Sequence, residues 1–261
     1  MIIEYVPLLQ VQRKLQGMPR NRERFMTYLQ TIGARDSGGI LELPSLMIAN
    51  PMGKDHVTRY LDELLAMQAD EIAAQAVAEV TAQFPQEPGE FKIAMVVADD
   101  LMGGWTNRCA DEYTLRFPPA LPTGHSGDLP RWLKDFWLTA VLWTSDKPSA
   151  QRVQDTVTTV IHRIVWLRHH GVAQTLREML VQEGAVLARA GCKEPMLDLE
   201  DIEYTREVLA PCLDSTDKRT IMECLFGDEA CKTLGFSPRG LSHWAGLALA
   251  LHDSQYKEVT T

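Results

Sequence analysis

The residues best suited to chemistry stand together in one segment, 99–108, which reads DDLMGGWTNR. Asp99 or Asp100 could act as a general acid or base, or could bind a divalent metal ion. The adjacent glycines let a ligand approach the backbone closely, and Arg108 could hold a carboxylate or phosphate through two parallel hydrogen bonds. The segment predicts a site for a small polar or anionic ligand, bound by Gly103, Gly104, Trp105, Thr106, Asn107 and Arg108, with Asn50 and Lys54 from a second loop.

The segment that must position these residues is 91–98, FKIAMVVA, which carries apolar side chains on both faces of a strand. A strand buried on both faces belongs in the middle of a covered sheet. Ligands of open parallel sheets bind at the carboxyl ends of the strands, where Asp99 and Asp100 stand. The two-residue period of a strand points these two side chains to opposite faces. The alternative interpretation is a turn, in which one aspartate caps a helix and Arg108 pairs with Asp111 or Glu112.

A second loop, 50–56, reads NPMGKDH and precedes a helical pattern. Backbone donors and the dipole of a helix N-terminus could favour an anion there, beside Lys54. The alternative is a tight turn at Gly53 with Asp55 as the helix cap. Because the only Gly-Lys pair, Gly53-Lys54, is followed by Asp55, it does not fit the GxxxxGK[ST] loop of nucleotide hydrolases, and we exclude that class.

The expected elements form a strand–helix–strand unit. We expect a strand near 45–49, a helical region over about 54–83 and the strand at 91–98, paired in parallel. Segment 113–117 reads as another strand, and 131–143 fits either a helix or a strand.

From residue 148 onward the pattern is helical, with Gly171 and Gly191 ending two helices and Asp198 capping a third. The expected fold is a mixed, helix-rich α/β protein. A small, mainly parallel sheet lies in the N-terminal half with helices packed on it, and the C-terminal half is helical. We expect one compact domain over 1–261, with a subdivision into 1–128 and 129–261.

The net charge and the distribution of charged residues indicate which classes of partner the protein could bind. A net charge of -9 argues against general affinity for nucleic acid, since binding phosphates needs clustered Lys and Arg. One basic segment, 13–24, runs against this balance. It is either a solvated helix face or a docking surface for an acidic protein partner. Its cations are Arg13, Lys14, Arg20, Arg22 and Arg24.

Five cysteines, an odd number without a CxxC pair, fit free thiols in a reducing compartment. The opening MIIEYVPLL has an early Glu4 and does not read as a signal peptide. No apolar run approaches the ~20 residues of a membrane-spanning helix. We therefore expect a cytoplasmic protein without a membrane partner.

Two classes of function remain open. The first is an enzyme that acts on a small polar or anionic metabolite, with Asp99 and Asp100 as catalytic residues. A divalent metal ion held by those carboxylates is the one cofactor that the residues suggest. The second is a non-catalytic accessory or protein-interaction protein. Convergence of 50–56 and 99–108 on one site favours the first, and a flat apolar patch favours the second.

Overall fold

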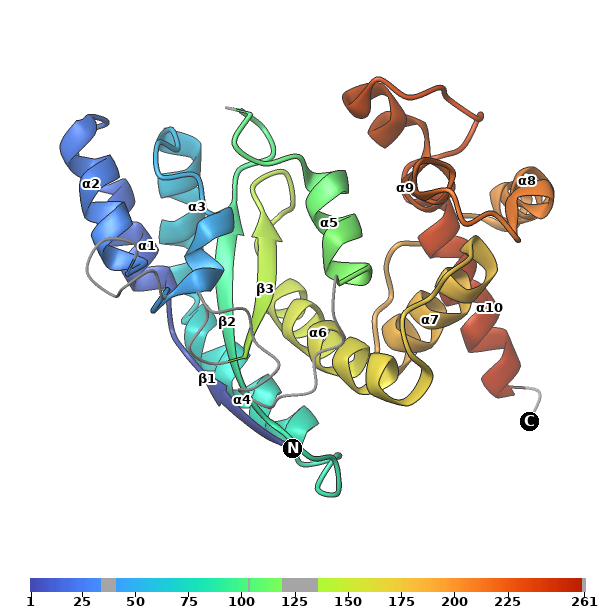
Figure 1. Cartoon of the computed structure of the whole chain (residues 1–261), viewed down its shortest axis with the longest axis horizontal. Coiled ribbons are helices and arrows are strands. Elements are labelled where there is room, and N and C mark those ends of the chain that lie inside the picture. The colour runs from blue at the N-terminus through green and yellow to red at the C-terminus, as the bar shows by residue number, and fades with distance from the viewer. Residues whose placement is uncertain (34–40, 103, 119–135, 260–261) are drawn as a thin grey trace. The chain divides into compact units, whose positions relative to one another are not determined.

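The computed structural model describes residues 1–33, 41–102, 104–118 and 136–259. Within these ranges the chain is a helix-rich α/β protein with a small parallel sheet, as the sequence predicts (Figure 1). Its strands are β1 (Ile2–Tyr5), β2 (Glu90–Ala98) and β3 (Trp137–Trp143), and β2 lies in the middle. Both neighbours run parallel to β2, with Ile2 opposite Glu90 and Trp143 opposite Ala98.

The central strand is buried as its sequence predicts, and Ile93 to Ala98 are each 0% exposed. The edge strand β1 is shorter than β2 and ends at Tyr5. Beyond Tyr5, the side chain of Gln12 forms hydrogen bonds with β2 that the backbone of a neighbouring strand would otherwise form. Its amide Nε2 donates to the carbonyl of Val97 at 2.6 Å, and the Val97 amide donates to Gln12 Oε1 at 2.9 Å. A side chain therefore completes the hydrogen bonding of β2 near the end where the candidate site begins.

Two predicted strands are wrong. Residues Pro44–Ile48 form the 3-10 helix η1, because Pro44 sits in its first turn, where the fixed φ of proline suits a helix start. The parallel partners of β2 are β1 and β3 instead of a strand at 45–49. Segment 113–117 is mostly helical, since α5 spans Arg108–Arg116 with Tyr113 and Arg116 on its buried face. The ambiguous segment 131–143 ends in β3, and residues 131–135 lie outside the described ranges.

The connection from β1 to β2 is helical. It contains α1 (Leu9–Gln16), α2 (Arg22–Thr31), α3 (Asp55–Ala66) and α4 (Ala69–Thr81). The predicted helical region 54–83 is confirmed, with a break at Gln68, whose φ of 58° lies in the left-handed region. Figure 1 shows α1, α2 and α3 on one side of the sheet.

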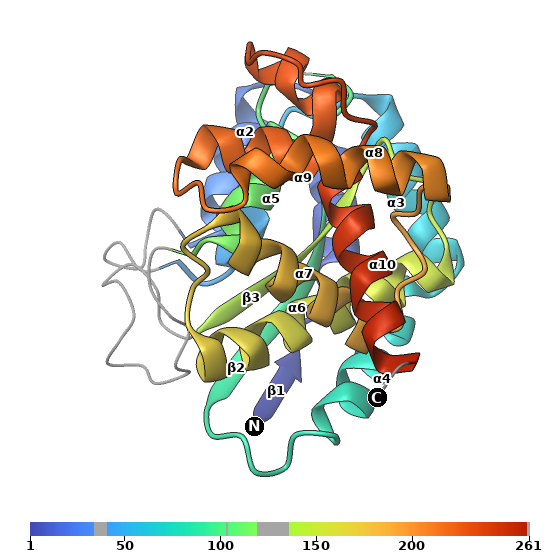
Figure 2. The same cartoon turned by 90° about the vertical axis from the view of Figure 1, so that its right-hand side faces the viewer.

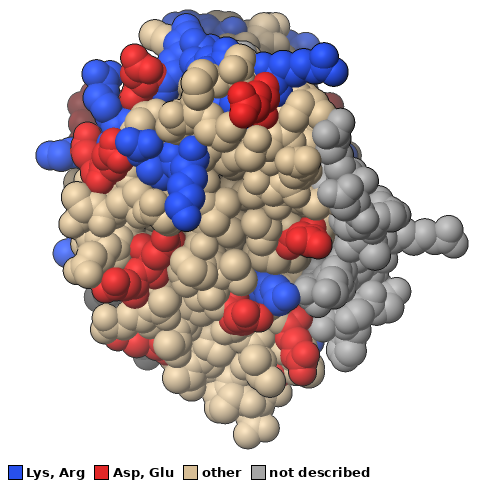
Figure 3. Space-filling model, turned by 90° about the vertical axis from the view of Figure 1, so that its left-hand side faces the viewer, with Lys and Arg blue, Asp and Glu red and all other residues tan. Residues whose placement is uncertain are grey.

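The basic segment 13–24 is not a uniform charged face. Arg13 forms an ion pair with Asp62, and Arg24 is only 1% exposed and donates to the carbonyls of Gln16, Met18 and Gly53. Lys14, Arg20 and Arg22 remain exposed. In Figure 3, Lys and Arg side chains gather toward the top of the face shown, with Asp and Glu among them.

The chain divides into two compact units, residues 1–108 with 122–161 and residues 109–121 with 162–261. The first unit holds the sheet and the candidate site. The predicted subdivision at residue 128 falls in 119–135, outside the described residues, and it stays a prediction together with the single compact domain.

The second unit is helical, as predicted. Helix α6 (Ala150–His170) enters it, and α7 (Leu176–Arg189), α8 (Leu199–Leu209), η3 (Ala210–Cys212), α9 (Lys218–Leu234) and α10 (Ala245–Val259) follow. Asp198 caps α8 as expected, accepting from the amide of Asp201. Helix α10 packs against α7, α8 and α9 (Figure 2). Glycine permits the contact with α7, because a Cβ at Gly184 would lie 2.3 Å from the carbonyl oxygen of Ala250.

A buried ionic cluster ties the second unit together. Glu183, fully buried on α7, accepts from Arg116 at 2.7 Å and from Arg163 at 2.9 Å. Burial acts to raise the pKa of Glu183, but the charges of Arg116 and Arg163 outweigh it and lower this pKa to about 2. Glu183 is therefore ionised at neutral pH.

In the part of the chain that is described, no helix has both the length and the apolar character needed to cross a membrane.

Candidate functional site

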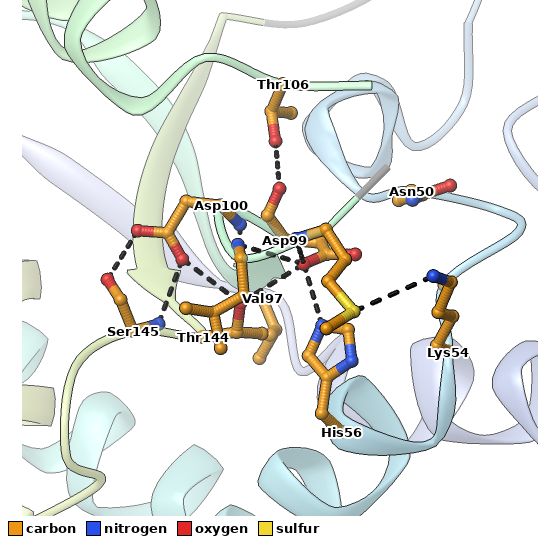
Figure 4. A network of polar contacts seen from close by, with 12 residues as sticks. Asn50, Lys54, His56, Val97, Asp99, Asp100, Thr106, Thr144 and Ser145 are labelled. Carbon is orange, nitrogen blue, oxygen red and sulfur yellow. Dashed lines mark hydrogen bonds and ion pairs between the residues drawn. The ribbon is translucent and has the colours of Figure 1, made fainter. Parts of the chain in front are cut away.

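The site is built around Asp99, the first residue after β2, which is 2% exposed. Its Oδ1 accepts from the amides of Leu101 and Met102 at 3.2 and 3.1 Å, so the side chain shapes the turn that leaves the strand. The same atom lies 2.7 Å from Nε2 of His56 (Figure 4). The other oxygen, Oδ2, is buried and has no hydrogen-bond partner among the described residues. Asp99 thus keeps one acceptor uncommitted.

His56 lies in the first turn of α3, at the end of loop 50–56. Its ring contacts Asp99, the first residue of segment 99–108. Its side chain is 17% exposed, so solvent or a ligand can reach the ring. An ionised carboxylate only accepts hydrogen bonds, so an ionised Asp99 requires a proton on Nε2 and leaves Nδ1 for other partners. Nδ1 has none among the described residues. A histidine held in this way by a buried aspartate is an arrangement that serves proton transfer.

Tyr60 lies one turn after His56 on α3 and is 6% exposed. Its hydroxyl is buried and has no partner in the described ranges. Burial first, and then the charge of Asp146, raises the pKa of this hydroxyl. Tyr60 is therefore a neutral phenol at any ordinary pH.

Asp100 turns to the segment after β3 and shares one group with Asp99, because the Thr144 hydroxyl also lies 3.4 Å from Asp99 Oδ1. Asp100 accepts from the backbone amide of Ser145 at 2.9 Å, from the Thr144 hydroxyl at 3.1 Å and from the Ser145 hydroxyl. All of these groups belong to the segment that leaves β3. Asp100 therefore ties the ends of two neighbouring strands together (Figure 4).

Arg108 completes this second cluster. It binds Asp146 through both oxygens, at 2.7 and 3.0 Å, and donates to Ser145 Oγ at 2.9 Å. Asp100 Oδ2 lies 3.5 Å away, and the guanidinium also lies over the ring of Trp143. Arg108 therefore contacts Ser145 and the carboxylates of Asp100 and Asp146. Its guanidinium is occupied by groups of the protein, and its side chain is 17% exposed.

The loop 50–54 lies beside segment 99–108. Asn50 is buried and shapes its own loop, since its Oδ1 accepts from the amide of Met52 at 2.9 Å. Lys54 Nζ lies 3.6 Å from the sulfur of Met102, which joins this loop to 99–108 (Figure 4). Lys54 is exposed and has no carboxylate partner within the described chain. The two loops therefore converge, through Lys54 with Met102 and through His56 with Asp99.

The rest of 99–108 serves mainly to hold the loop. Thr106 Oγ1 donates to the carbonyl of Asp99, and Trp105, 46% exposed, donates from its indole to the carbonyl of Met47 at 3.3 Å. Gly104 has a φ of 62°, and a Cβ there would meet nothing within 4 Å, so the glycine serves the turn rather than a close contact. Asn107 precedes α5 and is half-buried. Gly103 lies outside the described residues.

Sequence reasoning missed His56, Tyr60 and the segment Thr144–Ser145–Asp146. Weak signals for them were present in the sequence. His56 lies in the loop 50–56, and residues 144–146 follow the segment 131–143, which fits a strand as well as a helix. Neither signal tells which aspartate each group would meet. Among the described residues, no group of three or more His, Cys, Asp or Glu side chains is arranged to hold a metal ion.

Comparison with known proteins gives one partial similarity and no function. No protein family matches the chain, and no solved structure is similar to it. A stretch of 95 residues is 32% identical to the uncharacterized protein YjfC of Bacillus subtilis. The similarity covers 33% of this chain and 32% of that protein, so the chain spans about a third of the length of the relative it matches.

Proposed function

We propose that the protein is an enzyme that acts on a small polar or anionic metabolite, with His56 as its general acid–base and Asp99 as the residue that orients it. The observation that carries the proposal is the 2.7 Å contact between a partly exposed imidazole and a carboxylate that is otherwise buried. The pair stands at the carboxyl end of the central strand, which is where parallel sheets bind ligands.

The chemistry of the pair supports proton transfer. Asp99 fixes the orientation of the ring, and Nδ1 is left to take a proton from a substrate or return one. A carboxylate that is 2% exposed also stabilises the imidazolium that forms during the reaction.

Lys54 supports the anionic character of the substrate. It is the residue before α3, so its ammonium and the first backbone amides of α3 place positive charge beside His56. Its contact in the protein is a methionine sulfur, which does not neutralise it. We propose Lys54 as the residue that binds an anionic group of the substrate.

Asp100 and Arg108 have a structural role in this proposal, although the sequence suggests catalysis for Asp100 and ligand binding for Arg108. They hold the ends of β2 and β3 together through Ser145 and Asp146. We propose that they position the Asp99 turn without touching the substrate. A divalent metal ion at Asp99 and Asp100 is less supported, because no group of three or more His, Cys, Asp or Glu side chains among the described residues is arranged to hold one. The five unbridged thiols support the cytoplasm as the place of action.

The experiment is a substrate screen with a matched pair of variants. Wild-type protein, His56→Gln and His170→Gln are each incubated with pooled organic acids, amino acids and sugar phosphates, and consumption is followed by NMR. His170 is an exposed histidine on α6, so the same substitution there is the control. We expect wild type and His170→Gln to consume the same compound, and His56→Gln to be slower by about 10²- to 10⁴-fold with a similar melting temperature.

Equal consumption by His56→Gln and wild type would remove His56 from the reaction. If no pooled compound is consumed by the wild type, and none raises its melting temperature, the result would favour the non-catalytic accessory protein instead.

A further inference from the structure

We propose that the substrate of this site is an amphipathic anion, whose anionic head group binds Lys54 and whose apolar chain of several carbon atoms covers four exposed side chains nearby. These four side chains are called the apolar patch, and they are Met47, Leu101, Met102 and Trp105. The inference rests on the proposed function, because it names the class of substrate that the same site would take.

The exposed apolar side chains are unevenly distributed. Single exposed apolar residues are normal on a protein surface and need no explanation. Nine large apolar side chains are exposed in the described chain, and the four at positions 47, 101, 102 and 105 all belong to the first unit. Each of these four is between 46% and 55% exposed. An exposed apolar patch beside polar groups is typical of a binding surface.

Two contacts join the segments that carry the apolar patch. The Trp105 indole donates to the carbonyl of Met47 at 3.3 Å. Lys54 Nζ lies 3.6 Å from Sδ of Met102 (Figure 4). Met47 and Lys54 belong to one segment, and the other three apolar residues belong to segment 99–108. The two segments therefore lie against each other, and Lys54 lies beside Met102.

The apolar patch also adjoins the pair proposed for catalysis. The backbone amides of Leu101 and Met102 donate to Asp99 Oδ1 at 3.2 and 3.1 Å. The same oxygen lies 2.7 Å from Nε2 of His56. A ligand that covers Leu101 and Met102 is therefore close to the imidazole ring.

Lys54 gives the apolar patch a positive charge at its edge. A thioether sulfur is a weak hydrogen-bond acceptor, so an anionic head group would replace the Met102 contact with a stronger, charge-assisted bond. Methionine is unbranched and flexible, so Met102 can then pack along a bound chain. An apolar patch alone would suit a protein partner equally well. The ammonium of Lys54 and the imidazole of His56 beside it favour a small amphipathic anion.

The test is a binding titration with butanoate, hexanoate and octanoate, three carboxylates that differ only in chain length. Binding to the full-length protein is measured by ligand-observed NMR, so no turnover is needed. If the chain lies on the apolar patch, each added methylene leaves water, and the affinity should rise about two- to fourfold per methylene. Octylammonium carries the opposite charge on the same chain, and it should bind at least about tenfold more weakly than octanoate.

Two methionine variants form a matched pair. Met102→Gln keeps the length of the side chain and makes it polar, and Met196→Gln makes the same change at a methionine of the second unit that is 81% exposed. We expect Met102→Gln to lose most of the dependence on chain length and Met196→Gln to keep it. Lys54→Gln should weaken all three carboxylates by a similar factor, about tenfold, because it removes the head-group contact alone. Melting temperatures check that each variant is folded.

An affinity that does not change with chain length, or that changes equally in wild type and Met102→Gln, would overturn the inference. Self-association that Met102→Gln abolishes, detected by light scattering, would also overturn it, because a second copy would then cover the apolar patch. Turnover judges the proposed function separately. If a short polar anion is consumed in a His56-dependent reaction while chain length has no effect on binding, the proposed function stands and this inference fails. If octanoate binds as expected and His56→Gln changes no turnover, the ligand class stands and the catalytic role fails.

Discussion

At the scale of single residues, the site depends on the difference between two adjacent aspartates. Asp99 turns to His56 and is nearly inaccessible, whereas Asp100 turns to the segment after β3. The period of the strand was enough to predict that they diverge. Which groups they would meet was not predictable, because His56 and Ser145 come from other elements whose distance depends on the whole unit.

Arg108 could either stabilise the fold through its ion pairs or bind the substrate, and substituting it distinguishes these two roles. Within the described chain, removing its side chain leaves Asp100 without its cation and Asp146 with only the more distant Arg152, at 3.9 Å. Arg108→Ala should therefore lower the free energy of unfolding by about 1–3 kcal/mol. Urea unfolding measures the change, and Arg177→Ala, whose partner Asp214 is exposed, is the control. If Arg108 instead binds the substrate, the variant keeps its stability and loses roughly 10- to 150-fold in affinity.

At the scale of elements, the sequence predicted most helices and the central strand, since these depend on local periodicity and on end signals such as Asp198. The prediction was wrong where the local sequence is compatible with two kinds of secondary structure. Residues 45–49 are apolar enough for a strand, yet Pro44 begins a 3-10 turn there. The strand at Ile2–Tyr5 has only four residues, which is too short for a pattern to stand out.

The crossing of α7 and α10 depends on Gly184. A methyl group there would press on the backbone carbonyl of Ala250, so Gly184→Ala must push the two helices apart. We expect a loss of about 1–3 kcal/mol in the free energy of unfolding, measured by urea titration. At Gly17 a Cβ would meet the flexible end of Arg13, and the backbone there is right-handed, so Gly17→Ala should change stability little. Equal losses in the two variants would contradict this account of the packing.

At the scale of the whole molecule, the order of strand and helix patterns predicted a helix-rich α/β protein with a small parallel sheet, and the structure agrees. Net charge and residue order could not predict which charges would be buried. Arg24 lies inside the fold, and Glu183 holds two arginines in the core of the second unit. The ion pairs of Glu183 join residues far apart in the chain, so no local sequence pattern predicts them.

The Glu183 cluster predicts a pH dependence of stability. Its pKa is about 2 in the folded protein and 4.5 as the ordinary value, so its contribution is complete above about pH 4.5 and is lost as the pH falls toward 2. Among the described residues, Glu183→Gln leaves the buried Arg163 without a carboxylate and Arg116 with Glu112 alone, and it should cost about 3–5 kcal/mol at pH 7. Urea unfolding of both proteins between pH 7 and 2 should show the difference narrowing below about pH 4.5. A difference that stays constant with pH would contradict the ionised state of Glu183.

The central claim is that His56 and Asp99 act as one catalytic unit, and a double-mutant cycle on turnover tests it most directly. Once the screen identifies a substrate, kcat is measured for wild type, His56→Gln, Asp99→Asn and the double variant, with melting temperatures alongside. If Asp99 works through His56, the double variant should be no more than a few-fold slower than His56→Gln alone, because the effects of residues that act as a unit are not additive. Losses that multiply across the two substitutions would contradict the pairing.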